Sequence, residues 1–190
     1  AQPPEQAFGL RADDVARALV REAASRGVTV ELVRNGSRGL YWLEPLVEVD
    51  TPAGRLAYGP VSVEDVPGLF DAGFLTGGMH RLGHGLTEHI PFLAGQERLT
   101  FRRVGVIDPR SLADYQNHGG FDGLRRALAL GDAAVVREVT DSGLRGRGGA
   151  AFPTGIKWAT VQTAGDGDKY VVCNADEGDS GTFADRLLLE

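Results

Sequence analysis

The sequence predicts an α/β chain with a small N-terminal domain followed by the first part of a second α/β domain. Three observations support this fold class. Residues 10–26 place apolar side chains at the spacing of an amphipathic helix, residues 46–58 alternate as the arms of a hairpin do, and the apolar run 170–173 follows a glycine-rich loop as a buried strand would. Helices and strands that alternate along a chain are typical of α/β domains.

The first domain begins with the predicted helix at residues 10–26, in which Asp13 and Asp14 suit the positive end of the helix dipole. Gly27 ends this helix. The remaining elements are a strand, a hairpin and a second helix, predicted at residues 28–33, 46–49 with 56–58, and 62–72. This order of elements predicts a thioredoxin-like domain over residues 1–75, although no opening strand is visible in residues 1–9.

Residues 76–100 are rich in glycine and histidine, which predicts a linker. His80 and His84 have the i, i+4 spacing of metal ligands on a helix. The glycines around them disfavour a helix there, so we expect no metal site.

Three short helices open the second domain, which we expect over residues 101–190. They are predicted at residues 111–115, 121–130 and 132–141. The third helix carries three valines on one face, which predicts that this face is buried: Val135, Val136 and Val139. Its end delivers the chain to the glycine-rich loop.

Four glycines lie close together in that loop: Gly143, Gly146, Gly148 and Gly149. Glycine leaves backbone N–H groups uncovered and permits positive φ angles, so a phosphate or a flat ring can approach closely. The spacing is neither the dinucleotide fingerprint nor a P-loop, because Ala151 follows the glycines and Trp158 follows Lys157. Taken alone, the cluster predicts either an anion or cofactor loop or an ordinary turn.

Polar side chains follow the predicted strand 170–173: Asn174, Asp176, Glu177 and Asp179. Such groups at the carboxyl edge of a sheet are typical of ligand sites in open α/β sheets. The carboxylates can accept hydrogen bonds from ribose hydroxyls or ring N–H groups, while Lys157 offers a positive charge. Phe152 and Trp158 can stack on a base. The alternatives are a solvated acidic loop and core contacts for the two aromatic rings.

Two segments carry a family resemblance: SGLRGRGGAAFPTGIKW at residues 142–158 and VVCNADEGDSGTFADR at residues 171–186. They resemble the flavoprotein subunit of respiratory complex I, NAD-reducing hydrogenases and NAD-dependent formate dehydrogenases. The resemblance starts at residue 101 with FRRVGVIDPRSLADYQNHGGFDGLRRAL. It implies FMN and NAD as cofactors, with hydride transfer by the flavin and no catalytic side chain. The cofactor-binding residues that it implies are Gly146, Arg147, Gly148, Gly149, Phe152, Gly155, Lys157, Asn174, Asp176, Glu177 and Asp179.

Three positions depart from the complex I pattern: Ala151 replaces a glycine, Thr160 replaces a phenylalanine, and Gly178-Asp179-Ser180 replaces Ser-Glu-Pro. These departures resemble the soluble formate dehydrogenase branch. The resemblance therefore implies an NADH:acceptor (diaphorase) subunit that passes electrons between iron–sulfur centres and NAD through FMN, in a cytoplasmic formate dehydrogenase. There are two alternatives. The chain is the equivalent subunit of complex I or of an NAD-reducing hydrogenase, or it is a non-catalytic docking module that keeps the fold.

The segment SRGLYWLEPLV at residues 37–47 resembles the cluster-binding loop of the small two-iron thioredoxin-like partner in the same enzymes. Ser37 and Tyr41 stand where that loop has cysteines, and neither replaces a thiolate ligand, so the first domain should hold no cluster. Cys173, the one cysteine, is expected to be a buried, inert thiol of a strand. The resemblance implies iron–sulfur clusters in the part of the subunit beyond residue 190 and in partner subunits. One of these partners is expected to be a catalytic alpha-type subunit.

Charge and hydropathy argue against two classes of partner, nucleic acids and membranes. A net charge of −6 and a pI near 5.3 disfavour a nucleic-acid surface. The longest apolar runs fall far short of the roughly twenty residues that span a bilayer, so we expect no membrane insertion. Residues 1–9 show no signal-peptide pattern.

Overall fold

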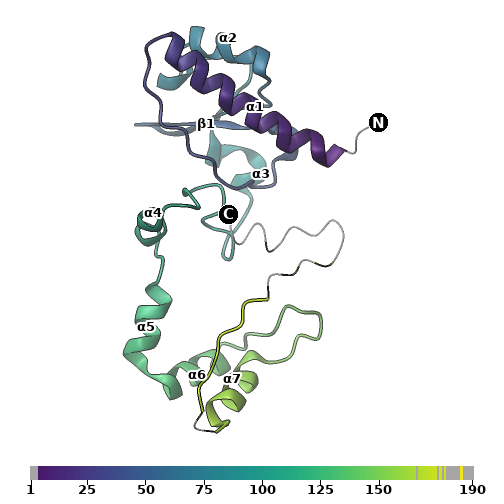
Figure 1. The fold of residues 1–190 in the computed structure, drawn as a ribbon, viewed down its shortest axis with the longest axis vertical. Helices are drawn as coiled ribbons and strands as arrows, with labels where there is room; N and C mark the ends of the chain where they lie inside the picture. Colours follow the sequence, from purple (N-terminus) through teal and green to yellow (C-terminus); the bar gives the residue numbers. More distant parts are fainter. Residues whose placement is uncertain (1–3, 166, 175, 177, 179–184, 186–190) are drawn as a thin grey trace. The chain divides into compact units, whose positions relative to one another are not determined.

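The structure is a computed structural model that describes residues 4–165, 167–174, 176, 178 and 185. These residues form two compact units (Figure 1). The first unit extends to Pro109, and the second runs from Arg110 to Asp185.

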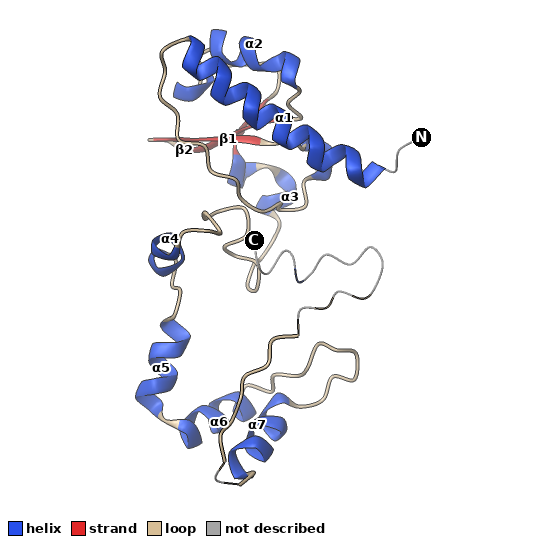
Figure 2. Ribbon diagram, viewed as in Figure 1, coloured by secondary structure: helices blue, strands red, loops and turns tan. Residues whose placement is uncertain are grey.

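The first unit is built on a three-stranded antiparallel sheet in the order β1, β2, β3, with bounds Val47–Thr51, Gly54–Tyr58 and Gly83–Leu86. Figure 2 shows α1 (Pro4–Ser25) and α2 (Val66–Asp71) on one side of the sheet and α3 (Pro91–Ala94) on the other. The core accordingly has two parts. Tyr58 belongs to the cluster under α1 and α2, while its neighbour Ala57 belongs to the cluster with Leu93 of α3, because successive strand residues point to opposite faces.

Short 3-10 helices connect these elements: η1 (Tyr41–Leu43), η2 (Val63–Asp65), η3 (Phe74–Thr76) and η4 (Thr87–His89). The helices predicted at residues 10–26 and 62–72 and the hairpin at residues 46–58 are confirmed. The predicted linker residues 76–100 contain β3, η4 and α3, and they bury Leu82, Ile90 and Leu93 in the first unit. The thioredoxin-like assignment itself stays a prediction, although helices packed on a small sheet agree with the α/β class.

The strand predicted at residues 28–33 is wrong, since the chain there has no strand pairing. Val28, Leu32 and Val33 are 39%, 36% and 44% exposed, so the alternating pattern has no covered face. A strand needs a neighbour for its backbone groups, and the described sheet ends at β1 and β3.

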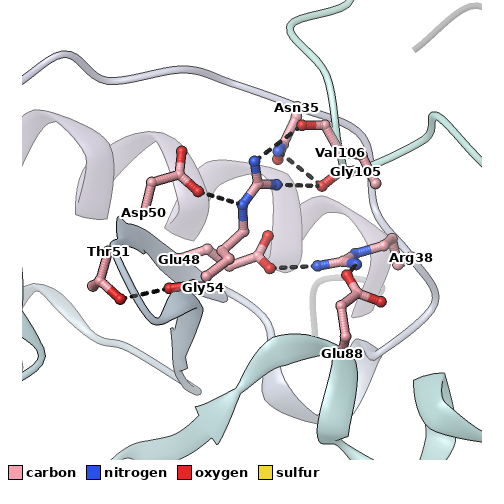
Figure 3. A network of polar contacts seen from close by, with 10 residues as sticks. Asn35, Arg38, Glu48, Asp50, Thr51, Gly54, Glu88, Gly105 and Val106 are labelled. Atoms are coloured by element: carbon pink, nitrogen blue, oxygen red, sulfur yellow. Dashed lines mark hydrogen bonds and ion pairs between the residues drawn. The ribbon is translucent and has the colours of Figure 1, made fainter. Parts of the chain in front are cut away.

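A buried ion-pair network fixes the end of the first unit (Figure 3). The Arg38 side chain is 3% exposed and donates to the carboxylates of Glu48 and Glu88. Arg55 donates to the carbonyl oxygens of Gly105 and Val106 over 3.2 and 3.1 Å, which ties the segment after residue 101 to β2. Buried charges of this kind are tolerated because each is paired.

The second unit contains four helices in its described part: α4 (Leu112–Asn117), α5 (Asp122–Leu130), α6 (Asp132–Asp141) and α7 (Thr154–Thr163). The three helices predicted at residues 111–141 are confirmed. The valines of α6, whose face we predicted to be buried, are half-buried. The sequence pattern did not predict α7. No described helix is long and apolar enough to cross a bilayer.

The strand predicted at residues 170–173 is also wrong. Tyr170 and Val172 are 82% and 85% exposed, and Cys173 is exposed, so its expected burial is wrong as well. In the part of the second unit that the structure describes, no sheet offers these residues a neighbouring strand. A run of four apolar residues cannot form a strand without such a partner.

Candidate functional site

The glycine-rich loop forms a hairpin, which we define as residues 144–154 and call the glycine hairpin. Its two arms are joined by the Thr154 amide, which donates to the Leu144 carbonyl over 2.9 Å, and by the Gly146 amide, which donates to the Phe152 carbonyl over 2.9 Å. Arg145 and Pro153 face each other in a bridge between these bonds. The second arm leads directly into α7.

The tip of the glycine hairpin presents unused backbone donors. Within the described structure, the N–H groups of residues 147–152 donate to no protein acceptor. Gly149 has φ +101° and Ala151 has φ +49°, both in the left-handed region. Successive N–H groups in a loop of alternating handedness form a concave site for an anion, so the tip can receive a phosphate or the polar edge of a ring.

Cationic side chains lie at the hairpin, among them those of Lys157 and Arg147. The ammonium nitrogen of Lys157 in α7 lies 5.8 Å from the Phe152 ring centre and 3.6 Å from where a Cβ on Gly146 would be. Arg147 donates to the Arg145 carbonyl over 2.9 Å. Lys157 and Arg147 meet no carboxylate in the part of the chain that the structure describes, so their charges remain available to a ligand.

Two aromatic side chains on this part of the chain are partly open to solvent. Phe152 is 46% exposed and Trp158 is 45% exposed. The Phe152 ring is therefore partly accessible to a ligand, in addition to its contact with the ammonium group of Lys157.

The structure gives two of the predicted glycines distinct roles. Gly148 has no neighbour within 4 Å of its Cβ position, which leaves the backbone there open. Gly155 is instead buried, and a Cβ on it would lie 2.3 Å from the hydroxyl oxygen of Thr140. It lets α7 pack closely against α6, so its link to the site is through the placement of α7.

We call residues 174–179 the acidic loop, of which residues 174, 176 and 178 are described. These three make no described hydrogen bond or ion pair with the glycine hairpin. Asn174 and Asp176 are exposed, and the Asp176 amide donates to the Asn174 side-chain oxygen over 3.1 Å. Glu177 and Asp179 lie outside the described residues. The structure thus gathers the predicted residues from Gly146 to Lys157 in one local unit, and leaves their relation to Asn174 and Asp176 as a prediction.

A separate cavity of about 460 Å³ lies within the first unit. Its wall includes Ser37 and Tyr41, the two residues at the predicted cysteine positions. Ser37 donates to the Glu44 carboxylate, and the described wall holds no thiol. Burial, aided by the charge of Arg38, lowers the pKa of the Arg98 guanidinium in this wall. Hydroxyl groups and guanidinium groups are not ligands for a two-iron cluster.

Comparisons with known proteins relate the second half of the chain to a protein family. The family model described as the Nuo51 FMN-binding domain matches residues 139–190, which include α7 and the glycine hairpin. Relatives include the NADP-reducing hydrogenase subunit HndC of Solidesulfovibrio fructosivorans, 52% identical over 95 residues, covering 50% of this chain and 19% of that protein. A second relative is a subunit of the NADH-quinone oxidoreductase of Escherichia coli strain K12, 43% identical over 94 residues, covering 48% of this chain and 21% of that protein.

The NAD-reducing hydrogenase HoxS subunit alpha of Cupriavidus necator is 53% identical over 85 residues, covering 45% of this chain and 12% of that protein. The chain spans about a fifth of the length of most curated relatives named here. The predicted resemblance is confirmed: this chain carries a segment related to the FMN-binding domain of the flavoprotein subunits of complex I and NAD-reducing hydrogenases.

Proposed function

We propose that the protein is the NADH:acceptor (diaphorase) subunit of a multi-subunit oxidoreductase, and that it binds FMN and NAD. The observation that carries the proposal is the glycine hairpin, with its row of N–H groups that meet no acceptor among the described residues and with Lys157 beside it. The match of residues 139–190 to an FMN-binding domain supports the same assignment.

The described residues fit an anionic flavin cofactor. N–H groups of residues 147–152 can hold a phosphate or a ring carbonyl, and Lys157 and Arg147 can neutralise its charge. Phe152 offers a partly exposed aromatic ring against which a nicotinamide or flavin ring can stack. When bound, the flavin supplies the hydride chemistry, while the protein supplies position and electrostatics.

Formate dehydrogenase is the complex that we propose. The motif departures at Ala151, Thr160 and Asp179 support it, because they resemble that branch of the family. A catalytic alpha-type subunit would oxidise formate in the cytoplasm, and its electrons would reach this subunit through iron–sulfur centres, including that of a small two-iron thioredoxin-like subunit. The names of the relatives support the alternatives, namely the corresponding subunit of complex I or of an NAD-reducing hydrogenase.

A non-catalytic docking module is the second candidate. The observation that favours it is the exposed run from Tyr170 to Val172, which offers an apolar surface next to a predicted cofactor loop. In such a module the glycine hairpin is kept for its fold alone. The two candidates differ in one property that can be measured directly, the presence of flavin.

The test is to purify the intact complex under native conditions and to record its visible spectrum, its FMN content and its partner subunits. A flavin absorption band with stoichiometric FMN supports the diaphorase, and a colourless folded protein supports the docking module. The reductant of the bound flavin then identifies the complex. Reduction by formate indicates formate dehydrogenase, and reduction by H₂ indicates a hydrogenase. Reduction by NADH but by neither of the other two indicates complex I. Lys169→Ala serves as a charge control for variants of Lys157, because Lys169 is an exposed lysine whose ammonium group hydrogen-bonds only to a backbone carbonyl among the described residues.

A further inference from the structure

We infer that Arg145 is a positioning residue of the cofactor site, whose guanidinium group clamps the glycine hairpin in its binding shape. This inference rests on the proposed function, since it concerns how the hairpin is prepared for FMN. Arg145 is not among the cofactor-binding residues that the family resemblance implies.

The Arg145 side chain crosses the hairpin. Its Nη1 donates to the Ala151 carbonyl on the opposite arm over 2.7 Å, a length typical of a hydrogen bond with a charged donor. The backbone bonds between the arms stop at Gly146. The guanidinium group therefore supplies the last cross-link before the tip at residues 147–150.

The clamp acts on a residue in an unfavourable conformation. Ala151 has φ +49°, which a residue with a Cβ adopts only at a cost. A fixed Ala151 carbonyl holds the backbone in this turn, so the following residue, Phe152, accepts its bond from Gly146 and starts the arm that leads into α7. The same turn leaves the amides of residues 147–152 without an acceptor among the described residues.

Arg147 depends on the same residue through the backbone. Its Nη1 donates to the Arg145 carbonyl over 2.9 Å, so one side of its guanidinium group is fixed. The Arg145 side chain donates to the opposite arm of the hairpin, at Ala151, whereas the Arg147 side chain donates to its own arm, at Arg145. The two arginines thus have different tasks: Arg145 holds the two arms together, and Arg147 is itself a residue of the tip.

The experiment compares wild-type protein with Arg145→Gln and Arg145→Lys in the intact complex, with Arg137→Gln as control. Arg137 is an exposed arginine of α6 for which the described structure shows no bonded partner, so its variant makes the same charge change away from the hairpin. Two quantities are measured: the FMN dissociation constant after removal and return of flavin, and hydrogen–deuterium exchange of a peptide covering residues 144–153 in the flavin-free protein.

Arg145→Gln should weaken FMN binding about tenfold or more, because a charge-assisted hydrogen bond is lost. It should also speed exchange in the hairpin peptide without changing exchange in α6. Arg145→Lys should lie between Arg145→Gln and wild type, since lysine keeps the charge but only a single-point donor. Adding Ala151→Gly to Arg145→Gln should recover part of the affinity, because glycine adopts positive φ freely.

Wild-type exchange and wild-type FMN affinity in Arg145→Gln would overturn the inference. So would full recovery of affinity by Arg145→Lys with the hairpin peptide still exchanging fast, since charge alone would then explain binding. If the wild-type complex binds no FMN, the proposed function fails by itself. The exchange comparison in flavin-free protein still decides whether Arg145 clamps the hairpin, and Arg145→Lys keeps that decision possible if Arg145→Gln does not fold.

Discussion

Gly155 of α7 lies against Thr140 of α6 so closely that a Cβ on the glycine would be 2.6 Å from the threonine Cα. Real Cβ atoms do not approach backbone this closely, so the two helices can keep their distance only with glycine at this position. Lys157 lies two residues further along α7. The packing of α6 on α7 therefore helps to decide where the lysine ammonium group lies.

Gly155→Ala should destabilise the second unit by about 1–3 kcal/mol, because the new methyl group forces the helices apart. Weaker FMN binding should follow, since Lys157 moves with α7. Urea unfolding followed by Trp158 fluorescence, in a Trp42→Phe background, measures the loss. Gly123→Ala is the matched control: its Cβ would meet no atom within 4 Å in α5, so alanine should be neutral or stabilising by about 1 kcal/mol. Equal stability of Gly155→Ala and wild type would contradict the packing argument.

Arg38→Met should cost the first unit about 3–5 kcal/mol, because Glu48, with its side chain 13% exposed, keeps a buried charge without a partner. Glu88 is 69% exposed and can turn to water. The double variant Arg38→Met, Glu48→Leu should recover most of the loss, since both charges of this buried pair are then removed. Urea unfolding followed by Trp42 fluorescence in a Trp158→Phe background gives the free energies, with exposed Arg102→Met as control. A double variant no more stable than Arg38→Met alone would argue against this account.

Apart from α3 and α7, the α-helices and the hairpin set by local sequence could be predicted, and elements that need distant partners could not. The helix at residues 10–26 has its own apolar face, and the hairpin at residues 46–58 has its own turn, so both appear where the pattern places them. Residues 28–33 and 170–173 have the composition of strands but lack neighbours in the described sheet. A strand pattern states only that a pairing would be favourable, and it does not provide the partner.

The same distinction applies to the site. Gly146, Phe152 and Lys157 lie within one hairpin and the first turn of the next helix, so closeness in sequence was enough to group them. Apart from the family resemblance, the grouping of Asn174 with them depended on the strand predicted at residues 170–173, which the described chain does not form. The contacts of Arg38 with Glu48 and of Arg145 with the Ala151 carbonyl are made by their side chains, and no spacing in the sequence indicated them.

Lys157→Ala should weaken FMN binding tenfold or more, equivalent to about 1.5–3 kcal/mol for a hydrogen bond to a charged group. The fold should be unaffected, because the lysine ammonium group contacts only the Phe152 ring and the Gly146 region in the described structure. Flavin content and FMN affinity of the intact complex test this, and Lys169→Ala should behave as wild type. Unchanged affinity in Lys157→Ala would assign the lysine a purely structural role.

The 190-residue chain should hold no iron–sulfur cluster after incubation with iron and sulfide under reducing conditions. The Ser37 hydroxyl group is hydrogen-bonded to the Glu44 carboxylate, and the Tyr41 side chain is 58% exposed. Cys173 carries the one thiol in the sequence. A two-iron cluster takes four cysteine or cysteine and histidine ligands, which this chain does not supply. The visible spectrum and bound iron are the readouts, with Cys173→Ser as a control for iron held loosely by the thiol. A stable two-iron spectrum in both proteins would refute the prediction.

NAD should be preferred over NADP by the intact enzyme, and this preference should depend on the acidic loop. Asp176, Glu177 and Asp179 place up to three negative charges after residue 173, and the last two lie outside the described residues. A 2′-phosphate about 4 Å from a carboxylate is opposed by roughly 1–4 kcal/mol, depending on how much water remains, whereas a 2′-hydroxyl can donate to the same carboxylate. The names of the relatives include both an NADP-reducing and an NAD-reducing hydrogenase, so family membership alone does not fix the choice.

The ratio of kcat/KM for NADH and NADPH, measured with an artificial acceptor, reports this preference. We expect at least a tenfold ratio in favour of NADH, equivalent to about 1.4 kcal/mol. Asp179→Asn should narrow the ratio by raising kcat/KM for NADPH, because one repulsive charge is removed. Asp168→Asn is the matched control, since it removes an exposed carboxylate that precedes the loop. Equal use of both cofactors by the wild type would refute the charge argument, and a strong NADH preference unchanged by Asp179→Asn or Asp176→Asn would place the selectivity in residues other than these carboxylates.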